Sequence, residues 1–486
     1  MTRLSLAALR RAGRSPALDR GALRTGVVHL GIGAFFRAHG ALLTEDAMLA
    51  EGSGDWGISA VTGRSPRVRD QLAPQDGLFT VTERGAGGRP TRLVSSVREV
   101  IAGPRDPAGV LARIADPATR IVTLTITEKG YRIAPRTGGL DLADPAVAAD
   151  LAGAAPTTPI GQLARGLQAR LRGDGGPLTV VSCDNLPENG ALTARLVAEF
   201  AEALPGSEGA ELRSWTAART AFPSTMVDRM VPATTAADLD RVEQDLGLRD
   251  EGAVIAEPFF QWVIEDAFAA ARPDWAAAGA RFTADVRPWE AAKLRILNAA
   301  HSLVAYLGLI GGYATIAESV ADERVAAAAR GLVHSEVLPA ITLPGGLDGP
   351  AYGDSVLERF ANPALGHTTA KVAGDGSQKI GPRLLSTAGA SLAAGREPRW
   401  SALAVAAWMR HVADAGTELD DPLAGPLRAL LAEPGGGGRG TVPALLRSDV
   451  FPEELAAAPA FAALVGHWYG VLERAGLDGL TAEETA

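Results

Sequence analysis

Apolar runs rich in β-branched residues alternate with Ala-, Leu- and Arg-rich stretches through the first half of the chain. The apolar runs predict strands at residues 27–30, 58–61, 79–81, 121–127 and 178–183. Each run is followed by turn residues or by a helical pattern, an alternation that is typical of βαβ units and a mostly parallel sheet. We therefore expect an α/β fold for this half of the chain.

The pattern changes near Pro288, where Ala and Leu begin to dominate and convincing strand runs disappear. Four helices are predicted, at residues 294–309, 326–338, 401–415 and 459–475. We place the domain boundary there, with an α/β domain over residues 1–286 and a mainly α-helical domain over residues 287–486. The GGGGRG segment at residues 435–440 predicts a flexible surface loop within the second domain.

Length and composition narrow the class of protein. The chain has 486 residues, which allows two or three domains of roughly 150 residues each. Its 47 basic and 56 acidic side chains give a net charge of −9. That balance argues against a nucleic-acid partner and leaves room for a local basic pocket. The single cysteine, Cys183, excludes a disulfide framework and a zinc site built on several thiolates, and the seven histidines contain no His-x-x-x-His pair, so no metal is predicted.

The sequence predicts neither a leader nor a membrane segment. The N-terminal apolar run, residues 4–9, is too short for the core of a signal peptide. The longest apolar stretch, residues 297–321, contains Asn298, His301 and Glu318, so a buried helix explains it better than a membrane span. We expect a cytoplasmic protein that acts without a membrane partner.

The first candidate for chemistry is the segment at residues 26–49, where an apolar strand runs into Gly31-x-Gly33 and a helix follows. Glycines at such a turn let backbone N–H groups approach a pyrophosphate at the start of the helix. Phe36 stands where the third glycine of the G-x-G-x-x-G fingerprint is expected. An ordinary strand–helix turn is the alternative, and the location after the first strand favours a nucleotide site.

The end of the second strand bears on the choice of cofactor. An acidic residue that would bind the ribose 2′-OH is missing there, and Arg64, Ser65 and Arg67 are present instead. An arginine with a hydroxyl is the chemistry that accepts a 2′-phosphate, whereas solvated loop charges are the plain alternative. The residues leave NAD and NADP both open.

The second candidate opens the helical domain. At about 100° per residue, Glu290, His301 and Asn298 lie roughly 60°, 80° and 140° around the helix from Lys293. These polar groups share one broad side with leucines, which indicates either a buried hydrogen-bond network or a site. A desolvated lysine can act as general base towards an alcohol, and an amide N–H can stabilise the developing alkoxide. Taken singly, His301 is better explained as a core histidine.

Three further segments carry polar groups. Asn185 follows a strand, at the sheet edge where α/β proteins bind ligands, although its neighbours also favour a plain turn. Asp228 and Arg229 lie between apolar residues, which predicts a partly buried anchor that is structural or catalytic. Lys371 and Lys379 flank a Gly-Asp-Gly turn, and they either face a substrate rich in hydroxyl or carboxylate groups or lie on an exposed turn.

Seven motifs occur in order along the chain, namely GIGAFFRAH, TEKGY, SCDNLPENG, FPSTMVDRM, EPFFQWVIED, KLRILNAAH and DGSQK. In this combination the sequence resembles the long-chain polyol dehydrogenase family, which includes mannitol 2-dehydrogenase and fructuronate reductase. The resemblance covers residues 27 to at least 409. It implies a metal-independent NAD- or NADP-dependent oxidoreductase, with a Rossmann-type domain followed by a mainly helical domain, that interconverts a sugar alcohol or aldonate and its 2-ketose in the cleft between them.

The resemblance also implies roles for single residues. Lys293 would be the general acid/base, and Asn298 would pair with Asn185 to bind the substrate oxygen. His301 would contact a neighbouring hydroxyl, and Glu290 would lie on a proton path to solvent. The substrate-binding set would be Asp228, Lys371 and Lys379. The cofactor-binding set would be Gly31, Gly33, Phe35, Arg37, Arg64 and Ser65.

Two departures from the family pattern keep alternatives open. The missing acidic residue puts the usual NAD preference in doubt, and Lys371 and Gly374 replace the Arg and His that precede the DG-S-x-K run in the mannitol enzymes. One alternative is a sugar-phosphate dehydrogenase of the mannitol-1-phosphate type, for which Lys371 and Arg359 are the nearby basic candidates. The other is a nucleotide-binding sensor that kept the fold and lost the chemistry. The presence of Lys293, Asn298, His301 and Asn185 argues against it, because a sensor has no need for these residues.

Overall fold

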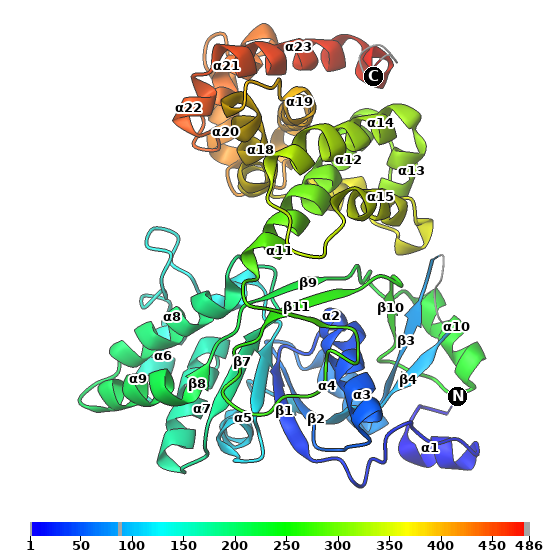
Figure 1. Cartoon of the computed structure of the whole chain (residues 1–486), viewed down its shortest axis with the longest axis vertical. Coiled ribbons are helices and arrows are strands. Elements are labelled where there is room, and N and C mark those ends of the chain that lie inside the picture. Colours follow the sequence, from blue (N-terminus) through cyan, green and yellow to red (C-terminus); the bar gives the residue numbers. More distant parts are fainter. Residues whose placement is uncertain (1, 86–89, 481–486) are drawn as a thin grey trace. The chain divides into compact units, whose positions relative to one another are not determined.

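The structure is a computed structural model that describes residues 2–85 and 90–480. Its internal contacts divide the chain into two units, Met1–Arg287 and Pro288–Ala486. In Figure 1 the first unit runs from blue to green and the second from green to red. Among the described residues, no helix combines the length and the apolar character that crossing a membrane requires.

Unit 1 is built on a parallel sheet of six strands in the order β5-β2-β1-β6-β7-β8. The strands are β1 (Thr25–Leu30), β2 (Gly57–Thr62), β5 (Val97–Ala102), β6 (Ile121–Leu124), β7 (Leu178–Ser182) and β8 (Thr220–Ala221). When these six strands are numbered along the chain, their order in the sheet is 3-2-1-4-5-6, the doubly wound Rossmann order, in which the direction of winding reverses between β1 and β6. The predicted α/β fold with a Rossmann-type parallel sheet is confirmed.

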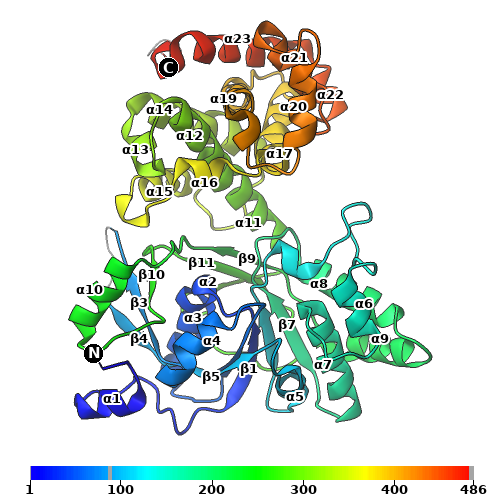
Figure 2. The same ribbon diagram turned by 180° about the vertical axis from the view of Figure 1, so that it is seen from behind.

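Helices cover both faces of this sheet (Figures 1 and 2). Alternate residues of a strand point to opposite faces, and in β1 Val27 joins one hydrophobic core while Val28 and Leu30 join the other. Burial on both faces explains why β1, β2, β6 and β7 read as mainly apolar runs with few polar residues. The helices of this unit are α1 (Leu6–Arg11), α2 (Ala34–Ala38), α3 (Gly40–Glu51), α4 (Arg67–Leu72), α5 (Pro107–Ala115), α6 (Pro145–Leu151), α7 (Pro159–Arg172), α8 (Asn189–Glu202), α9 (Glu208–Arg219) and α10 (Ala236–Leu246), with single 3₁₀ turns η1 (Ala73–Gln75) and η2 (Glu128–Tyr131).

Two strand predictions need correction. The strand at 79–81 exists as β3 (Phe79–Glu83), but it lies outside the main sheet, between β10 (Val254–Ala256) and β4 (Arg92–Val94). The strand predicted to reach residue 127 ends at Leu124, because the Asp184 carboxylate accepts the N–H groups of Ile126 and Thr127 and bends the chain away from the ladder. A third sheet, which the sequence did not predict, contains β12 (Arg281–Thr283), β11 (Gln261–Glu265) and β9 (Thr225–Asp228).

Unit 2 is helical over the residues that the structure describes. Its centre is α19, which is buried from Trp400 to Met409 and packs on α12 and α23. Its main helices are α11 (Arg287–Ala292), α12 (Ala299–Ile310), α13 (Ile316–Ala321), α14 (Glu323–Gly331), α15 (Gly349–Phe360), α16 (Thr369–Ala373), α17 (Gly376–Ile380), α18 (Ser386–Ala393), α19 (Arg399–Ala415), α20 (Ala424–Ala432), α21 (Thr441–Leu446), α22 (Glu453–Ala456) and α23 (Pro459–Ala475). The shorter turns are η5 (Leu338–Ala340), η6 (Pro363–Leu365), η8 (Gly416–Glu418), η9 (Gly438–Gly440) and η10 (Gly476–Gly479).

The four helices predicted for this unit lie where the sequence placed them, but two of them are not continuous α-helices. The helix predicted at 459–475 has the bounds of α23, and the one at 401–415 begins two residues earlier as α19. The other two are interrupted by π-helical turns, η3 (Lys293–Asn298) and η4 (Leu332–Val337). A third π-helical turn is η7 (Gly381–Leu385). Residues 435–440 form a mostly exposed loop that ends in the 3₁₀ turn η9.

The N-terminus of α19 is capped by a residue distant in sequence. Its own N-cap, Pro398, offers no side-chain acceptor. Instead the Glu336 carboxylate, 3% exposed, accepts the N–H groups of Trp400 and Ser401 and the Ser401 hydroxyl at 2.6 Å. Burial raises the pKa of the Glu336 carboxyl, while these donors and the positive end of the helix dipole favour its charged form. Glu336 therefore ties η4 to the central helix of the unit.

Replacing Glu336 by alanine should destabilise unit 2, because two buried N–H groups lose their acceptor. Hydrogen bonds to a charged group contribute about 1.5–3 kcal/mol, so we expect the unfolding free energy to fall by roughly 3 kcal/mol. Chemical denaturation followed by circular dichroism measures this. The control is Glu433→Ala, which breaks an exposed pair with Arg447 and should cost less than about 1 kcal/mol. Equal effects of the two substitutions would contradict the capping role.

Candidate functional site

The edge of the main sheet where β1 and β6 end is the place at which the winding direction reverses. Ligands of doubly wound folds bind outside the carboxyl ends of the strands at this point. Gly31 follows β1 here with φ +99°, and a Cβ at this position would lie 2.2 Å from the Thr125 carbonyl oxygen. Only glycine therefore permits the close approach of the two chain segments.

The chain then enters α2 through Gly33, the N-cap of this five-residue helix. The first N–H groups of a helix have no acceptor within it, so they remain available to a ligand. Gly31, Gly33 and Phe35 are partly exposed, and the Phe35 ring stacks on His39 at a centroid distance of 5.0 Å. Glycines and helix N–H groups at the switch point are the donor set that a pyrophosphate requires, so these residues fit a dinucleotide.

Phe36, which replaces the third glycine, faces the interior. Its ring is stacked on His29 of β1 at 3.3 Å. Room for the ring comes from Gly40, where a Cβ would lie 2.6 Å from the Phe36 ring. In the usual fingerprint the third glycine lets the helix pack closely on the strand. Here the buried Phe36 ring and Gly40, one turn later, allow the same close packing.

His29 joins β1 to β6 and to the segment that follows β6. Its Nδ1 lies 2.8 Å from Thr123 Oγ1 and its Nε2 lies 3.1 Å from Thr125 Oγ1. The Thr125 hydroxyl donates to the Gly31 carbonyl at 2.8 Å, so this network assigns the ring proton to Nε2. Complete burial lowers the pKa of His29 to about 3. The imidazole is therefore neutral and structural, directly beneath the candidate cofactor site.

Arg37 has a placement that the sequence argument did not anticipate. It is 6% exposed, and its guanidinium donates to the Gly33 carbonyl at 3.2 Å and to the Gly252 carbonyl. Burial lowers its pKa to about 10. The side chain thus fastens α2 to the chain before β10 from inside the unit, while a cofactor contact through it stays a prediction.

Arg64 and Ser65 follow β2 and are exposed. Ser65 and Arg67 line a cavity of about 580 Å³, which also has Asp70 and Glu251 in its wall. The Ser65 hydroxyl accepts the N–H of Arg67 at 3.2 Å. The second-strand edge therefore offers the Ser65 hydroxyl and Arg67 beside an open space, with Arg64 next to Ser65 in the chain and two carboxylates that moderate the positive charge.

The buried carboxylate of Asp184, just after β7, organises the same sheet edge. It accepts the N–H groups of Ile126 at 3.0 Å and Thr127 at 2.8 Å, and the Tyr131 hydroxyl at 2.9 Å. Thr127 has φ +63° and ψ 161°, a backbone conformation almost confined to glycine. Such strain persists only where surrounding bonds enforce it, and here Asp184 does so.

Asn189 fixes the other side of this loop. Its amide donates to the Asp184 and Thr225 carbonyls, both at 2.9 Å, and accepts the Thr225 N–H at 2.9 Å. In the SCDNLPENG motif, Asp184 and Asn189 are therefore the scaffold, and the neighbouring Cys183 is buried in the core. Asn185 is exposed at the carboxyl end of β7. Asp184 and Asn189 thus fix the backbone on both sides of Asn185. A substrate-binding amide needs such a fixed position.

Asp228 ends β9 and is buried, and Arg229 follows it. The Arg229 guanidinium donates to the Glu257 carbonyl at 2.8 Å and to the Glu83 carboxylate at 2.6 Å. A further donation goes to the Ala38 carbonyl at the end of α2. Arg229 is therefore the buried anchor that the sequence predicted, and its role is structural. Asp228 lies at the end of β9, and a role for it in substrate binding stays a prediction.

In unit 2, Lys293 and Asn298 are the two ends of the π-helical turn η3. Such turns are hydrogen-bonded from residue i to i+5, and they occur often at functional sites. Residues five apart therefore lie one turn apart on one side of the helix. The α-helical spacing used above, which put Asn298 about 140° from Lys293, overstates their separation. Glu290 and Lys293 are half-buried, and Asn298 is buried.

His301 lies one turn further along, on α12. Its ring stacks on Phe360 at 4.7 Å and on His367 at 5.9 Å. Burial, together with the positive charges of Arg383, Arg359 and Lys379 and the neighbouring His367, lowers the pKa of His301 well below its usual value. Its Nε2 is buried and has no hydrogen-bond partner within the part of the chain that the structure describes. A neutral imidazole with an unused nitrogen fits contact with a substrate hydroxyl better than a satisfied core histidine.

The segment that follows places the remaining predicted side chains. Lys379 on α17 donates to the carbonyls of Val372, at 3.3 Å, and Gly374, so it closes the end of α16. Arg383 on η7 donates to the Ser302 hydroxyl at 3.0 Å and to the Asn298 carbonyl at 3.4 Å. Lys371 on α16 is exposed. Arg383, His367, Asp184 and Asn189 are not among the residues predicted from the sequence, although the last two lie inside the SCDNLPENG motif.

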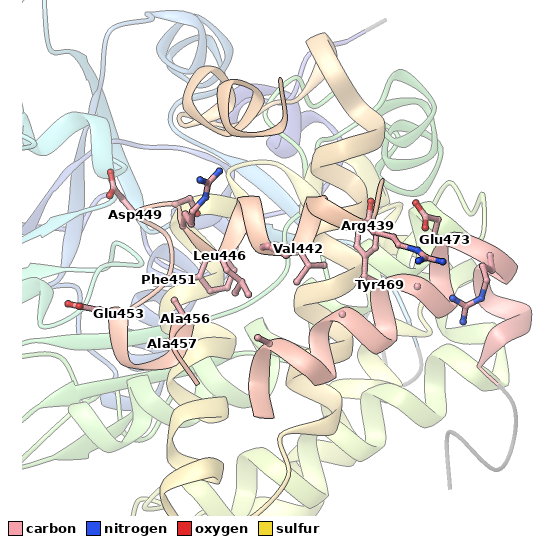
Figure 3. A pocket seen from close by; sticks show the side chains of 17 residues that line it. Arg439, Val442, Leu446, Asp449, Phe451, Glu453, Ala456, Ala457, Tyr469 and Glu473 are labelled. Carbon is pink, nitrogen blue, oxygen red and sulfur yellow. The ribbon is translucent and has the colours of Figure 1, made fainter. Parts of the chain in front are cut away.

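A cavity of about 1080 Å³ in unit 2 lies among α21, α22 and α23 (Figure 3). Phe451 and Tyr469 form part of its wall, together with arginines and carboxylates, and none of the predicted site residues lines it. It therefore has no part in the candidate chemistry. Over residues 2–85 and 90–480, no group of three or more His, Cys, Asp and Glu side chains is arranged to hold a metal ion.

Two family models match the chain. The one described as the mannitol dehydrogenase Rossmann domain matches residues 25–277, and the one described as the mannitol dehydrogenase C-terminal domain matches residues 285–472.

Curated relatives and a solved structure match over most of their length. The D-mannonate oxidoreductase of Escherichia coli (strain K12) is 41% identical over 90% of this chain and 91% of its own. The polyol:NADP oxidoreductase of Gluconobacter oxydans (strain 621H) is 36% identical over 78% of each chain. Pseudomonas fluorescens mannitol 2-dehydrogenase, solved as a ternary complex with NAD and D-mannitol, is 32% identical over 98% of each chain with a TM-score of 0.83.

The buried His29 should make the stability of unit 1 depend on pH. An unfolded histidine binds a proton near pH 6.5, whereas the folded one, with a pKa of about 3, does not. Stability is therefore complete above pH 6.5 and falls by about 1.4 kcal/mol per pH unit as the pH decreases below it.

Urea denaturation of wild type and His29→Asn at pH 7, 6 and 5 measures this. The wild-type unfolding free energy should fall more steeply with decreasing pH than that of the variant. His467→Asn, which changes an exposed histidine on α23, is the control and should keep the wild-type slope. Equal slopes for wild type and His29→Asn would contradict the assignment of a neutral His29.

Proposed function

The chain belongs to the mannitol dehydrogenase family, and from that premise we propose that it interconverts a sugar alcohol or aldonate and its 2-ketose with a nicotinamide cofactor and without a metal. The observation that carries the proposal is the π-helical turn η3, which puts Lys293 and Asn298 one turn apart, with the unpartnered Nε2 of His301 one turn further on. The relatives of the chain include a D-mannonate oxidoreductase and a polyol:NADP oxidoreductase, which supports this range of substrates.

The cofactor is proposed to bind unit 1 at the β1–β6 switch point. Gly31 and Gly33 let the backbone approach the pyrophosphate, the N–H groups at the start of α2 bind it, and Phe35 borders it. When bound, a nicotinamide dinucleotide accepts hydride from the alcohol carbon or returns it to the ketose carbon. His29 and Arg37 hold the loop that carries these groups.

Lys293 is the proposed general acid/base. In the direction of oxidation its neutral amine accepts the hydroxyl proton, and in reduction its ammonium group returns that proton to the ketose oxygen. Asn298 and Asn185 donate N–H groups to the same oxygen and stabilise the charge that develops on it. Because Lys293 must be neutral to accept a proton, the rate of oxidation should rise with pH.

The neighbouring residues are proposed to bind the substrate and to relay the proton. His301 contacts an adjacent hydroxyl through Nε2, and Asp228 and Lys379 lie along the rest of the substrate. Glu290, three residues before Lys293 and therefore on the same side of the chain, passes the proton to solvent. These roles need only hydroxyl-bearing substrates, so they apply equally to a polyol and to an aldonate.

Lys293→Ala should slow turnover strongly without weakening cofactor binding. Loss of a general base typically reduces the rate by roughly 10²–10⁴-fold, and we expect kcat to fall in that range, whereas the Kd for the reduced cofactor changes less than about twofold. Absorbance at 340 nm measures turnover, and cofactor fluorescence measures binding. Arg330→Ala, an exposed substitution on α14, serves as the control. Activity of Lys293→Ala within tenfold of wild type would refute the assignment.

We further propose that Arg64 and Ser65 bind a 2′-phosphate, so that the chain uses NADP(H). Arg64→Ala should lower the ratio of kcat/KM for NADPH to that for NADH by roughly tenfold or more, as expected for one lost charge-assisted bond. The matched control is Arg69→Ala on α4, where the arginine is exposed and pairs with Asp70. An unchanged ratio in Arg64→Ala would mean that these arginines are solvated loop charges only.

A further inference from the structure

The proposed function makes no use of the cavity of about 1080 Å³ among α21, α22 and α23. Cavities that bind drug-sized molecules measure roughly 300–1,000 Å³, so this one has room for an organic ligand. One of its walls is a side of α23, along which Ala462, Gly466 and Gly470 recur at every fourth position. A Cβ at Gly466 would meet nothing within 4 Å. The missing side chain at this position therefore leaves open space along the helix.

Buried apolar side chains form the facing wall. Val442 and Leu446, four residues apart, lie on one side of α21, and Phe451 follows before α22. The Phe451 ring lies 6.0 Å from the ring of Trp408, which belongs to the central helix α19. This apolar wall offers a fixed surface on which the hydrocarbon or aromatic body of a ligand can pack.

Tyr469 is the polar residue of the cavity that calls for a ligand. The side chain is 5% exposed, and it lines the cavity from α23. Among the residues that the structure describes, its hydroxyl has no hydrogen-bond partner. The hydroxyl of a buried tyrosine usually has such a partner. A ligand with an acceptor oxygen would supply it.

Arg439 and Arg474 bring positive charge to the end of the cavity where Tyr469 lies. Figure 3 shows Arg439 and Tyr469 at this same end. The Nη1 atom of Arg474 lies 2.9 Å from the place that a Cβ of Gly470 would take, one residue after Tyr469. Both arginines are exposed, and neither has an ion pair or a side-chain hydrogen bond within the described part of the chain. Their guanidinium groups are therefore able to donate to a ligand.

The GGGGRG segment determines where Arg439 lies. A Cβ at Gly440 would collide with the carbonyl oxygen of Gly435, so only glycine lets the chain fold back on itself here. The Gly440 N–H donates to the Gly437 carbonyl at 3.1 Å. The arginine thus projects from a closed turn directly before α21.

The three carboxylates that line the cavity do not neutralise these arginines. Glu473 lies at the arginine end, but its carboxylate is 3.6 Å from Arg410 of α19. Figure 3 shows Asp449 and Glu453 at the opposite end. All three carboxylates are exposed, so water solvates them in the absence of a ligand.

Guanidinium groups beside a phenol hydroxyl form a donor set that suits the oxygens of an anion. The third arginine of the lining, Arg447, already pairs with Glu433. We propose that the cavity binds a small organic anion, with its acidic group at Arg439, Arg474 and Tyr469 and its apolar body on the apolar wall. This is a second ligand site of the chain, and it does not rest on the proposed function.

The test uses two fluorescent probes that share an aromatic body and differ by one anionic group. 8-Anilinonaphthalene-1-sulfonate carries a sulfonate, and N-phenyl-1-naphthylamine is its neutral counterpart. Each probe is titrated into the full chain with NAD or NADP in excess, so that the dinucleotide site is already filled. Sedimentation velocity records the mass of each variant.

Arg439→Gln and Arg474→Gln should each raise the Kd of the anionic probe about threefold to tenfold, because one charge-assisted bond is lost. The Kd of the neutral probe should change less than about twofold. Salt should weaken binding of the anionic probe only. The matched control is Arg396→Gln, which removes an exposed arginine after α18 and should leave both Kd values unchanged.

Two variants test the cavity itself. Gly466→Leu fills the open space, and it should weaken both probes by about tenfold or more, while the fold is kept because leucine is a better helix former than glycine. Its control is Gly389→Leu on α18, where a Cβ also meets nothing within 4 Å. Tyr469→Phe should raise the Kd of the anionic probe roughly threefold without lowering the unfolding free energy, since the hydroxyl has no described bond to lose.

Three results would overturn the proposal. Probe binding that Gly466→Leu leaves unchanged would mean that the probes bind elsewhere. Equal weakening of the two probes by Arg439→Gln, or the same effect from Arg396→Gln, would refute an anion site. A lower mass of Gly466→Leu than of wild type would mean that the cavity holds a second copy of the chain. None of these results involves turnover, so the proposed function is tested separately.

Discussion

The hydrogen bonds of one buried carboxylate define the working edge of unit 1. Asp184 is placed just after β7, yet the donors that it binds belong to the segment that follows β6. The carboxyl ends of parallel strands lie at a common edge of the sheet. The positions of the side chains beyond that edge depend on the hydrogen bonds that join the loops to one another. Here the fastening stops β6 short, holds Thr127 in a strained conformation and leaves Asn185 as the exposed amide of its motif. The adjoining glycine turn is held in the same manner, through Thr125 and His29.

The helical unit reaches a comparable result through irregular helices. A π-helical turn gains one residue relative to an α-helix, so it shifts the side chains that follow and weakens the local hydrogen bonding. In this chain η3 packs against η7 and η4, and the two neighbours supply Arg383, which bonds to the Asn298 carbonyl, and Glu336, which caps α19. The irregular turns thus lie together, and Arg383 of η7 holds η3 while Glu336 ties η4 to α19. This packing keeps Lys293, Asn298 and His301 in a fixed relation along one helix.

The sequence predicted those parts of the fold whose burial is uniform. Strands β1, β2 and β7 are buried on both faces and read as mainly apolar runs, and the apolar residues of α23 recur with a helical period. The strand β5 was missed because Arg98 and Glu99 interrupt its apolar pattern at the sheet edge. For β3 the strand was right and its partners were not, since pairing with β10 joins segments that are far apart along the chain. Among site residues, the polar face of Lys293 was visible in the spacing. The π-turn was not, because its cause is tertiary packing, and the same holds for Arg37, whose acceptor at Gly252 is distant in sequence.

The pairing of Phe36 with Gly40 has a consequence for how this nucleotide loop can evolve. Phe36 fills the space that a third glycine would leave, and it fits only because residue 40 lacks a Cβ. A lineage that restored the glycine alone would open a void under the sheet edge, and one that gained a side chain at position 40 alone would clash with the ring. The two positions must therefore change together. A search for related chains that demands three glycines would pass over every descendant that keeps this aromatic version of the loop.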